Sequence, residues 1–315
     1  MKDTKRACGV TVGTFDGVHL GHGLLLSTLA EACADSGLDP VVVTFDRHPL
    51  ETICPDRAPG LLMEGCSRDA LLRAAGCKVV VESFTAEYAG MTAAEWLERL
   101  RDAYGVALVV IGHDNKFGCD GRDMSVSDYV SLGRSLGVEV IVAPEREGVS
   151  SSVIRRLVTA GDVKAAERLL GRPFAICGKV VHGKALGRRI GFPTANVEPD
   201  YKALMPRRGV YYALADVGDG CIHRAVVNVG VRPSVDGEGS ERVSVEAYLP
   251  GFSGDLYGRK IRLWFKRMLR EEMTFHTLDD LRDAIARDVR DVLKEGKDMQ
   301  GEQKRELESC SHATA

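Results

Sequence analysis

This chain of 315 residues lacks several features that would define its class at once. No apolar run approaches the roughly 20 residues that a membrane-spanning helix needs. The charged N-terminus, residues 1–6, precedes no apolar signal segment. The nine cysteines are scattered singly without any Cys-x-x-Cys pair, which is typical of reduced, mostly buried thiols. These absences predict a cytoplasmic protein with no membrane partner, disulfide framework or cysteine-bound metal.

A large excess of charge of one sign is also absent. The formal net charge is −3, so charge gives no argument for a nucleic acid or an anionic membrane as partner. Hydrophobic residues make up 44% of the chain, and domains of about 100–200 residues are typical, so the length suits two domains with separate cores. We therefore expect small-molecule partners, and the sequence leaves the oligomeric state open.

What the first half does contain is an alternation of apolar, β-branched runs with helical stretches. Residues 93–104 and 127–136 have helical periodicity. The apolar runs between the helical stretches are predicted strands at residues 10–12, 41–45, 79–81, 106–111 and 138–142. This alternation predicts a Rossmann-like α/β domain whose parallel sheet is covered on both faces, with its site beyond the carboxyl ends of the strands.

From about residue 175 the pattern changes to short alternating segments broken by Gly, Pro and Asp. These segments predict strands at residues 176–181, 209–216, 222–229, 242–248 and 260–265. Closely spaced strands of this kind are typical of a small antiparallel β-barrel, and residues 278–293 follow as a helix. We predict a first domain at residues 1–172 that includes two linker helices, a second at residues 173–296, and a disordered tail at residues 297–315.

A glycine-rich segment with two histidines follows the first predicted strand and leads into a helix. It reads Gly-Thr-Phe-Asp-Gly-Val-His-Leu-Gly-His over residues 13–22. A helix start offers backbone N–H groups to a phosphate, and glycines allow close approach. The spacing of His19 and His22 puts both imidazoles on one side, where they can donate hydrogen bonds to a reacting phosphoryl group. A turn with two exposed histidines is the alternative, and a zinc site is disfavoured because no further ligand has suitable spacing.

The segment at residues 13–22 resembles the signature of the HxGH nucleotidylyltransferases, and its Phe-Asp-Gly-Val-His form resembles bacterial FAD synthetase. A second segment, Gly-Phe-Pro-Thr-Ala-Asn at residues 191–196, resembles the signature of riboflavin kinase. Together and in this order they resemble the bifunctional prokaryotic riboflavin kinase/FAD synthetase family over residues 8–292. The resemblance implies that the barrel phosphorylates riboflavin to FMN with ATP. It also implies that the first domain adenylylates FMN to FAD with release of pyrophosphate, and that both reactions use Mg²⁺.

In the first domain, the resemblance implies catalytic roles for His19 and His22 and a nucleotide site that includes the start of a later helix. The implied nucleotide contacts are Gly13, Phe15, Asp16, Gly21, Ser151, Ser152 and Arg155. The implied flavin contacts are Asp114 and Asn115, and Asp114 is also an implied ligand of magnesium. The two serines are also typical helix N-caps, and Asp114 is also typical of a turn.

Three residues of the first domain depart from the family pattern: Arg47, Asn115 and Ser152. They keep open an alternative function, a riboflavin kinase whose first module is an inactive or regulatory flavin- or nucleotide-binding domain. His48, next to Arg47, is interpreted as a structural histidine.

In the second domain, the resemblance implies that Glu246 accepts the proton of the riboflavin hydroxyl that attacks ATP. The implied nucleotide contacts are Gly178, Gly183, Gly187 and Pro193. Thr194 and Asn196 would offer neutral oxygens to magnesium, and Arg270 would contact the flavin. The alternatives are a β-turn at residues 191–196, a solvated strand face for Glu246 and a surface ion pair for Arg270.

Overall fold

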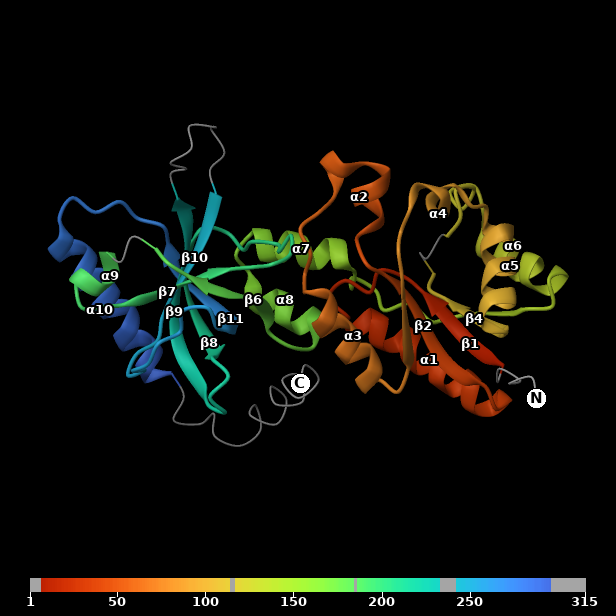
Figure 1. Cartoon of the computed structure of the whole chain (residues 1–315), viewed down its shortest axis with the longest axis horizontal. Helices are drawn as coiled ribbons and strands as arrows, with labels where there is room; N and C mark the ends of the chain where they lie inside the picture. The colour runs from red at the N-terminus through yellow and green to blue at the C-terminus, as the bar shows by residue number, and fades with distance from the viewer. Residues whose placement is uncertain (1–6, 114–116, 184–185, 233–241, 296–315) are drawn as a thin grey trace. The chain divides into compact units, whose positions relative to one another are not determined.

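The structure, a computed structural model, describes residues 7–113, 117–183, 186–232 and 242–295 (Figure 1). These residues pack into two compact units. The first unit contains the described residues up to Pro59 together with Gly65–Ser150, and the second contains Gly60–Glu64 together with the described residues from Ser151 onward. The chain therefore passes between the units after Pro59, after Glu64 and after Ser150.

The first unit is built on a sheet of five parallel strands in the order β3-β2-β1-β4-β5 (Figure 1). The strand order reverses between β1 and β4, and in such sheets a crevice forms beyond the carboxyl ends of the central strands. The strands are β1 (Cys8–Val12), β2 (Asp39–Phe45), β3 (Lys78–Glu82), β4 (Val106–Ile111) and β5 (Glu139–Val142). The helices are α1 (Leu20–Ser36), α2 (Pro49–Ile53), η1 (Pro55–Arg57), α3 (Gly65–Ala74), α4 (Ala86–Gly90), α5 (Ala93–Tyr104) and α6 (Val126–Ser135).

Helices cover both faces of this sheet. On one face, Leu29 of α1 and Leu72 of α3 join a buried cluster with Val110 of β4. On the other face, Leu97 of α5 and Tyr129 of α6 join a second cluster with residues of β1 and β4. The predicted Rossmann-like domain with a parallel sheet is confirmed.

The second unit is a closed antiparallel barrel in the strand order β10-β7-β6-β11-β8-β9 (Figure 1). The predicted barrel and its C-terminal helix are confirmed. The strands are β6 (Phe174–Val181), β7 (Thr194–Glu198), β8 (Gly209–Asp216), β9 (Ile222–Arg232), β10 (Arg242–Tyr248) and β11 (Lys260–Glu271). The helices are α7 (Ser151–Thr159), α8 (Val163–Leu170), α9 (Leu186–Arg189) and α10 (Leu278–Lys294).

The strand β8 is buried on both faces, although a barrel strand often has one face in solvent. Tyr211 and Ala213 point into the barrel core. Val210 and Tyr212 point outward into a separate cluster that includes Val292 of α10. The helix α10 therefore covers part of the outer face of the barrel, and Val210 of this face lines a cavity together with residues of α10.

The alternative of a β-turn over all of residues 191–196 is not realised, and one strand is longer than predicted. Residues 194–196 are not part of a turn, because they begin β7, and only the preceding Gly191 has a left-handed φ of 87°. The strand β11 continues to Glu271 rather than ending at residue 265. Its register shifts between Phe265 and Arg267 and again between Met268 and Arg270, and these irregularities break the alternation on which the prediction depended.

The two predicted linker helices exist as α7 and α8, and they pack with the barrel. Ile154, Val158 and Val163 belong to the same buried cluster as the barrel interior. The packing of the chain changes after Ser150, whereas the predicted domain boundary is at residue 172. A helix can pack on one unit and still belong to the neighbouring domain in sequence, so the boundary at residue 172 stays a prediction. The predicted tail, residues 297–315, lies outside the described residues.

Candidate active sites

The first candidate site begins where β1 leads into α1, and two stacked histidines mark it. His19 is the N-cap of α1, and its Nδ1 accepts a hydrogen bond from the backbone N–H of His22 at 3.2 Å. An accepting Nδ1 carries no proton, so the proton of the neutral ring lies on Nε2. The His19 and His22 rings are stacked, with centroids 3.7 Å apart and planes at 14°. Both imidazoles thus lie together at the positive end of a helix, as the spacing predicts.

The loop before His19 has an unusual backbone. Phe15 and Val18 have φ values of 49° and 35°, and Gly17 between them has a φ of 84°. Left-handed backbone is costly for residues with a Cβ, above all for a β-branched valine, and such strain concentrates at functional sites. Phe15 is 1% exposed, backbone included, and its side chain packs in the core, so its role here is to shape the loop, and its contact with a nucleotide stays a prediction.

Gly21 and Asp16 complete this loop. A Cβ at Gly21 would lie 3.2 Å from Nδ1 of His19 and 3.4 Å from the carbonyl oxygen of Val149, so a side chain at position 21 would crowd the capping histidine. Asp16 is buried, at 4% exposure. A Cβ at Gly13 would lie 3.3 Å from the Phe15 ring. The glycines and the buried residues together give the loop its shape.

Arg68 holds the ends of two central strands together. Its Nη1 donates to the carbonyl oxygen of Phe45 at 2.8 Å and lies 3.5 Å from that of Thr14. Its Nη2 forms an ion pair with Asp69 at 2.8 Å, and the side chain is 12% exposed. Thr44 adds a hydrogen bond of 3.3 Å to the same Thr14 carbonyl. Arg68 was not among the predicted site residues, because no sequence motif identifies a side chain that binds backbone carbonyls.

The loop after β2 contains one of the departures from the family pattern. Arg47 pairs with its neighbour Asp46 at 3.1 Å and is 54% exposed. This hydrogen bond holds the pKa of Asp46 below its usual value, and Asp46 Oδ1 also accepts the backbone N–H of Phe84 at 3.1 Å. His48 caps α2, because its Nδ1 accepts the N–H of Leu50 at 3.2 Å. The interpretation of His48 as structural is consistent with this cap.

Several predicted residues of the first site lie outside the described residues or belong to the second unit. Asp114 and Asn115 lie outside the described residues. Ser151 and Ser152 begin α7, which belongs to the second unit. Arg155 is in the same helix and donates its Nε to the carbonyl oxygen of Gly60 at 3.2 Å. Their roles at the first site stay predictions.

The second candidate site is formed by three neighbouring barrel strands. Glu246 of β10 pairs in register with Asn196 of β7 on one side and with Asn228 of β9 on the other. Two residues further along, on the same face, Tyr248 pairs with Thr194. The Thr194 hydroxyl donates a long hydrogen bond of 3.4 Å to Glu246 Oε2. The flanking residues of β10 point into the barrel core, so Glu246 projects from the outer face.

Asn196 has a buried amide oxygen beside this carboxylate. The residue is 8% exposed, and its Oδ1 accepts no hydrogen bond from the residues that the structure describes. A buried amide oxygen normally has a partner, and one without a protein partner next to a carboxylate is suited to a cation or a ligand.

The glycines around this site allow close backbone packing. A Cβ at Gly183 would lie 2.2 Å from Nδ2 of Asn196, and one at Gly187 would lie 2.3 Å from the carbonyl oxygen of Phe192. A Cβ at Gly178 would lie 2.6 Å from the carbonyl oxygen of Glu198. Gly183 and Gly187 therefore set the position of the segment that contains Asn196, and their direct contact with a nucleotide stays a prediction.

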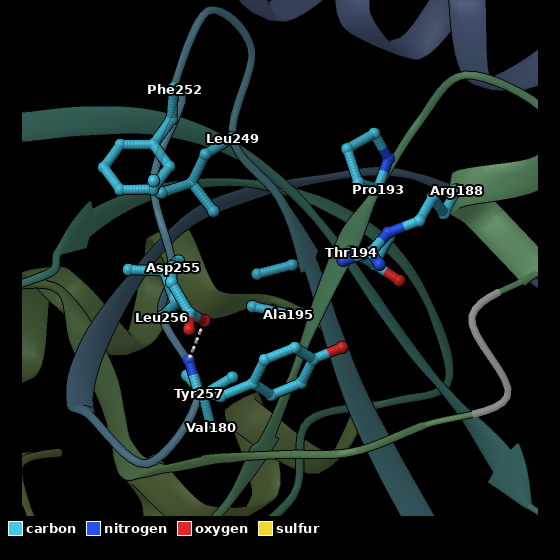
Figure 2. A pocket seen from close by; sticks show the side chains of 12 residues that line it. Val180, Arg188, Pro193, Thr194, Ala195, Leu249, Phe252, Asp255, Leu256 and Tyr257 are labelled. Carbon is cyan, nitrogen blue, oxygen red and sulfur yellow. Dashed lines mark hydrogen bonds between the residues drawn. The ribbon is translucent and has the colours of Figure 1, made fainter.

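Two cavities adjoin these residues, and Thr194 lines both. Figure 2 shows the larger cavity, of about 490 Å³, with Pro193 and Arg188 on one side and Phe252 and Asp255 on the other. Asp255 Oδ1 accepts the backbone N–H of Tyr257 at 2.9 Å, which fixes the turn at its edge.

The smaller cavity, of about 260 Å³, includes Glu246 and lies against α10. Its apolar lining is rich in flat and branched side chains: Ile190, Phe192, Tyr248, Phe275, Leu281 and Ile285.

Arg270 lines the smaller cavity but is also engaged in a close ion pair. Its Nε and Nη2 bind the Asp288 carboxylate of α10 at distances of 2.9–3.2 Å. Asp288 is 7% exposed, and the Arg270 guanidinium lies over the Phe275 ring at 5.6 Å. The alternative of an ion pair is therefore realised, in a partly buried form, and the predicted flavin contact of Arg270 stays a prediction. Asp288 was not among the predicted site residues, because its partner Arg270 is on a strand that is distant in the sequence.

Within the described ranges, no three His, Cys, Asp or Glu side chains are grouped as metal ligands. In the same part of the chain, no helix has the length and apolarity to cross a membrane.

The chain is similar to known proteins along nearly its full length. The family described as FAD synthetase matches residues 1–155, and the family described as riboflavin kinase matches residues 170–295. A bifunctional riboflavin kinase/FMN adenylyltransferase of Pseudomonas fluorescens is 38% identical, over 92% of this chain and 93% of its own length. The protein of the same description from Escherichia coli strain K12 is 36% identical, over 90% of this chain and 91% of its own length.

A solved structure from Streptococcus pneumoniae has the same fold. Its TM-score is 0.82 at 30% identity, and the match covers 93% of this chain and 96% of the other. That structure is named as a macrolide-efflux protein, which disagrees with the names of the curated relatives. The flavin-enzyme description agrees with both family matches and with the motifs at residues 13–22 and 191–196, so we follow it.

Proposed function

The chain belongs to the family of bifunctional riboflavin kinases/FMN adenylyltransferases, and from this membership we propose the reactions of its two units. The barrel phosphorylates riboflavin to FMN with ATP. The sheet unit transfers the adenylyl group of a second ATP to FMN, giving FAD and pyrophosphate. One observation supports this proposal best: this chain matches both families, in that order, and a bifunctional relative aligns over 92% of this chain and 93% of its own length.

In the barrel, Glu246 acts as the general base. Its carboxylate lines the smaller cavity, where it can accept the proton of the riboflavin hydroxyl as that oxygen attacks the γ-phosphorus of ATP. The hydrogen bond from Thr194 restrains the Glu246 carboxylate. Tyr248, opposite Thr194 in the ladder, lines the same cavity and narrows it.

The two cavities divide the substrates by their chemistry. The smaller cavity is lined by aromatic and aliphatic side chains and suits the flat, largely apolar ring system of a flavin. The larger cavity contains Arg188, Asp255 and the Thr194 hydroxyl and suits the polar nucleotide. Thr194 borders both, so the hydroxyl and the γ-phosphate would meet beside Glu246.

Magnesium is the cation that this site fits. Asn196 offers a buried oxygen without a hydrogen-bond partner among the described residues, and Thr194 offers a hydroxyl on the same strand. Neutral oxygens, completed by phosphate oxygens, suit the few protein ligands that Mg²⁺ takes in phosphoryl-transfer sites. When bound, the cation would neutralise charge on the transferring phosphate.

In the sheet unit, catalysis needs alignment and charge neutralisation rather than a base. The attacking group is the FMN phosphate, which is already an anion. His19, with its proton on Nε2, and the adjacent His22 can donate hydrogen bonds to the oxygens of the α-phosphate. The N-terminus of α1 adds backbone N–H groups and the favourable end of the helix dipole.

The second candidate, a kinase with an inactive first module, has less support. Arg47, one of the three departures from the family pattern, forms an ion pair with Asp46 at the surface. The two histidines of the first site, His19 and His22, are both present and stacked.

The test is incubation of the full-length protein with riboflavin, ATP and Mg²⁺, followed by chromatographic separation of the flavins. FMN is expected first and FAD afterwards. Accumulation of FMN without any FAD would favour the second candidate, and recovery of unchanged riboflavin would reject both.

A further inference from the structure

A segment of five residues from the FAD synthetase part of the sequence is built into the barrel unit. Gly60–Glu64 lies within the family match to FAD synthetase, residues 1–155, yet it packs with the second unit. Leu61 donates its N–H to the carbonyl oxygen of Lys202 at 2.8 Å, and its own carbonyl accepts the N–H of Leu204 at 2.8 Å. These bonds form a short parallel bridge between Leu61 and Ala203.

The packing of this segment is specific. Leu62 is 3% exposed and belongs to the buried cluster of the barrel interior. A Cβ at Gly60 would lie 2.8 Å from Cα of Leu204, so only glycine allows the two backbones to approach this closely. The segment therefore contributes to the core and does not simply lie on the surface.

Glu64 supplies a buried negative charge to the barrel. Its side chain is 6% exposed, with Oε2 at 2.6 Å from Nζ of Lys260 and Oε1 at 3.6 Å from Nη2 of Arg262. Arg262 is 13% exposed, and its Nε donates to Sγ of Cys177 at 3.0 Å. Burial raises the pKa of the Cys177 thiol to about 12, so this thiol stays uncharged at neutral pH. Glu64 is thus an ion-pair partner of both Lys260 and Arg262, and Asp200 is a second partner of Lys260 at 3.4 Å. Removing one partner of a largely buried ion pair is destabilising.

The partners of Glu64 lie next to the wall of the larger cavity. Lys260 begins β11, and it directly follows a turn fixed by two backbone hydrogen bonds. Val180 donates to the carbonyl oxygen of Arg259 at 2.8 Å and accepts the N–H of Gly258 at 2.9 Å. Val180 and Tyr257 both line the larger cavity. The first residues of β11 are therefore joined, through this turn, to the wall of the larger cavity.

We propose that Gly60–Glu64 completes the kinase, and that Glu64 is a positioning residue for the nucleotide cavity of the barrel. Through Lys260 and Arg262 it anchors the start of β11, and the turn before β11 carries Tyr257 into the cavity wall. A residue in the sequence of one enzyme thus supports the active site of the other. The kinetic part of this inference rests on the proposed kinase function, whereas its structural part does not.

The test uses full-length variants with matched controls. Glu64→Gln removes the charge, and Gly60→Ala displaces the same segment by a backbone clash without changing any charge. Glu87→Gln, an exposed carboxylate in the first turn of α4, is the control. In both test variants we expect the KM for ATP in the kinase reaction to rise about tenfold, because small displacements of positioning groups have effects of this size or larger. FMN adenylylation by Glu64→Gln should stay within about twofold of the parent, as expected for a substitution with no part in that reaction.

Hydrogen exchange followed by mass spectrometry separates this inference from the proposed function. In the two test variants, amides of β6 and β11 should exchange faster, while those of β1 and β4 stay unchanged. Faster exchange only in β1 and β4, or no change anywhere, would overturn the proposal whatever the enzyme activity. A fall in kinase kcat with no change in the KM for ATP would reject the positioning role. Equal loss of both activities would also reject it.

Discussion

The two candidate sites differ in whether backbone groups or side chains form most of the site. In the sheet unit, the site is made by backbone: a loop with left-handed residues, a helix N-terminus and two histidines stacked at its cap. In the barrel, it is made by side chains in register on adjacent strands, with Glu246 opposite Asn196. The difference follows from the nucleophile. A phosphate anion needs stabilising donors, whereas a hydroxyl group also needs a base.

The strongest test of this comparison is Glu246→Gln. Loss of a general base typically lowers a rate by about 10²–10⁴, and we expect a loss of this size in the phosphorylation of riboflavin. Adenylylation of supplied FMN should continue, because Glu246 belongs to the barrel unit and not to the sheet unit. Both products are measured by chromatography. Glu198→Gln, an exposed carboxylate at the end of β7, is the control. A kinase that keeps its parental rate without Glu246 would remove the proposed base from the mechanism.

The counterpart in the sheet unit is His22→Ala. Loss of one preorganised donor typically costs about 10²–10³ in rate, so FMN should accumulate while FAD formation slows by that factor. Formation of FMN in the same tube serves as the control for folding of the barrel. Equal slowing of both reactions would mean that the histidine supports the fold rather than the transfer.

A smaller effect is expected from Asn196→Leu, which removes the buried amide oxygen. We expect the Mg²⁺ concentration for half-maximal kinase activity to rise about tenfold, at the low end of the 10–100-fold losses seen when groups around a metal are altered. The Mg²⁺ dependence of adenylylation should not change. Titration of both reactions on one protein preparation gives the comparison, and an unchanged kinase titration would contradict the assignment of Asn196.

An effect of similar size to that of Asn196→Leu is expected in the sheet unit from Arg68→Ala. Its charged hydrogen bonds to the backbone are each worth about 1.5–3 kcal/mol, so its loss should slow adenylylation about tenfold by loosening the loop before His19. Arg73→Ala, an exposed arginine in the last turn of α3, is the control. If the two variants behave alike, Arg68 does not position the loop.

The sequence predicts most of the fold and only part of each site, for a physical reason. Local patterns identify the strand before residue 13, the histidine spacing and the alternation around Glu246, because each depends on neighbours in the chain. Strand β7 escapes prediction because its five residues follow Gly191 and Pro193, which are typical of a turn.

Contacts between distant segments were not predictable from the sequence. Arg68 binds the carbonyl of Phe45, 23 residues away, and Arg270 binds Asp288 across a strand and a helix. Neither contact leaves a recognisable sequence pattern, because a single ion pair or carbonyl contact does not require particular residue types at the neighbouring positions.

The three passages of the chain between the units have a consequence for its synthesis. Lys260, an ion-pair partner of Glu64, is synthesised 196 residues after it, and the barrel strands that bury Leu62 also come later in the chain. During translation the first unit can fold while this short segment is still exposed. If the gene were divided after residue 150, Gly60–Glu64 would be part of the N-terminal fragment, whereas the barrel into which it packs would be part of the C-terminal fragment. The two fragments would need to associate to restore a complete barrel core.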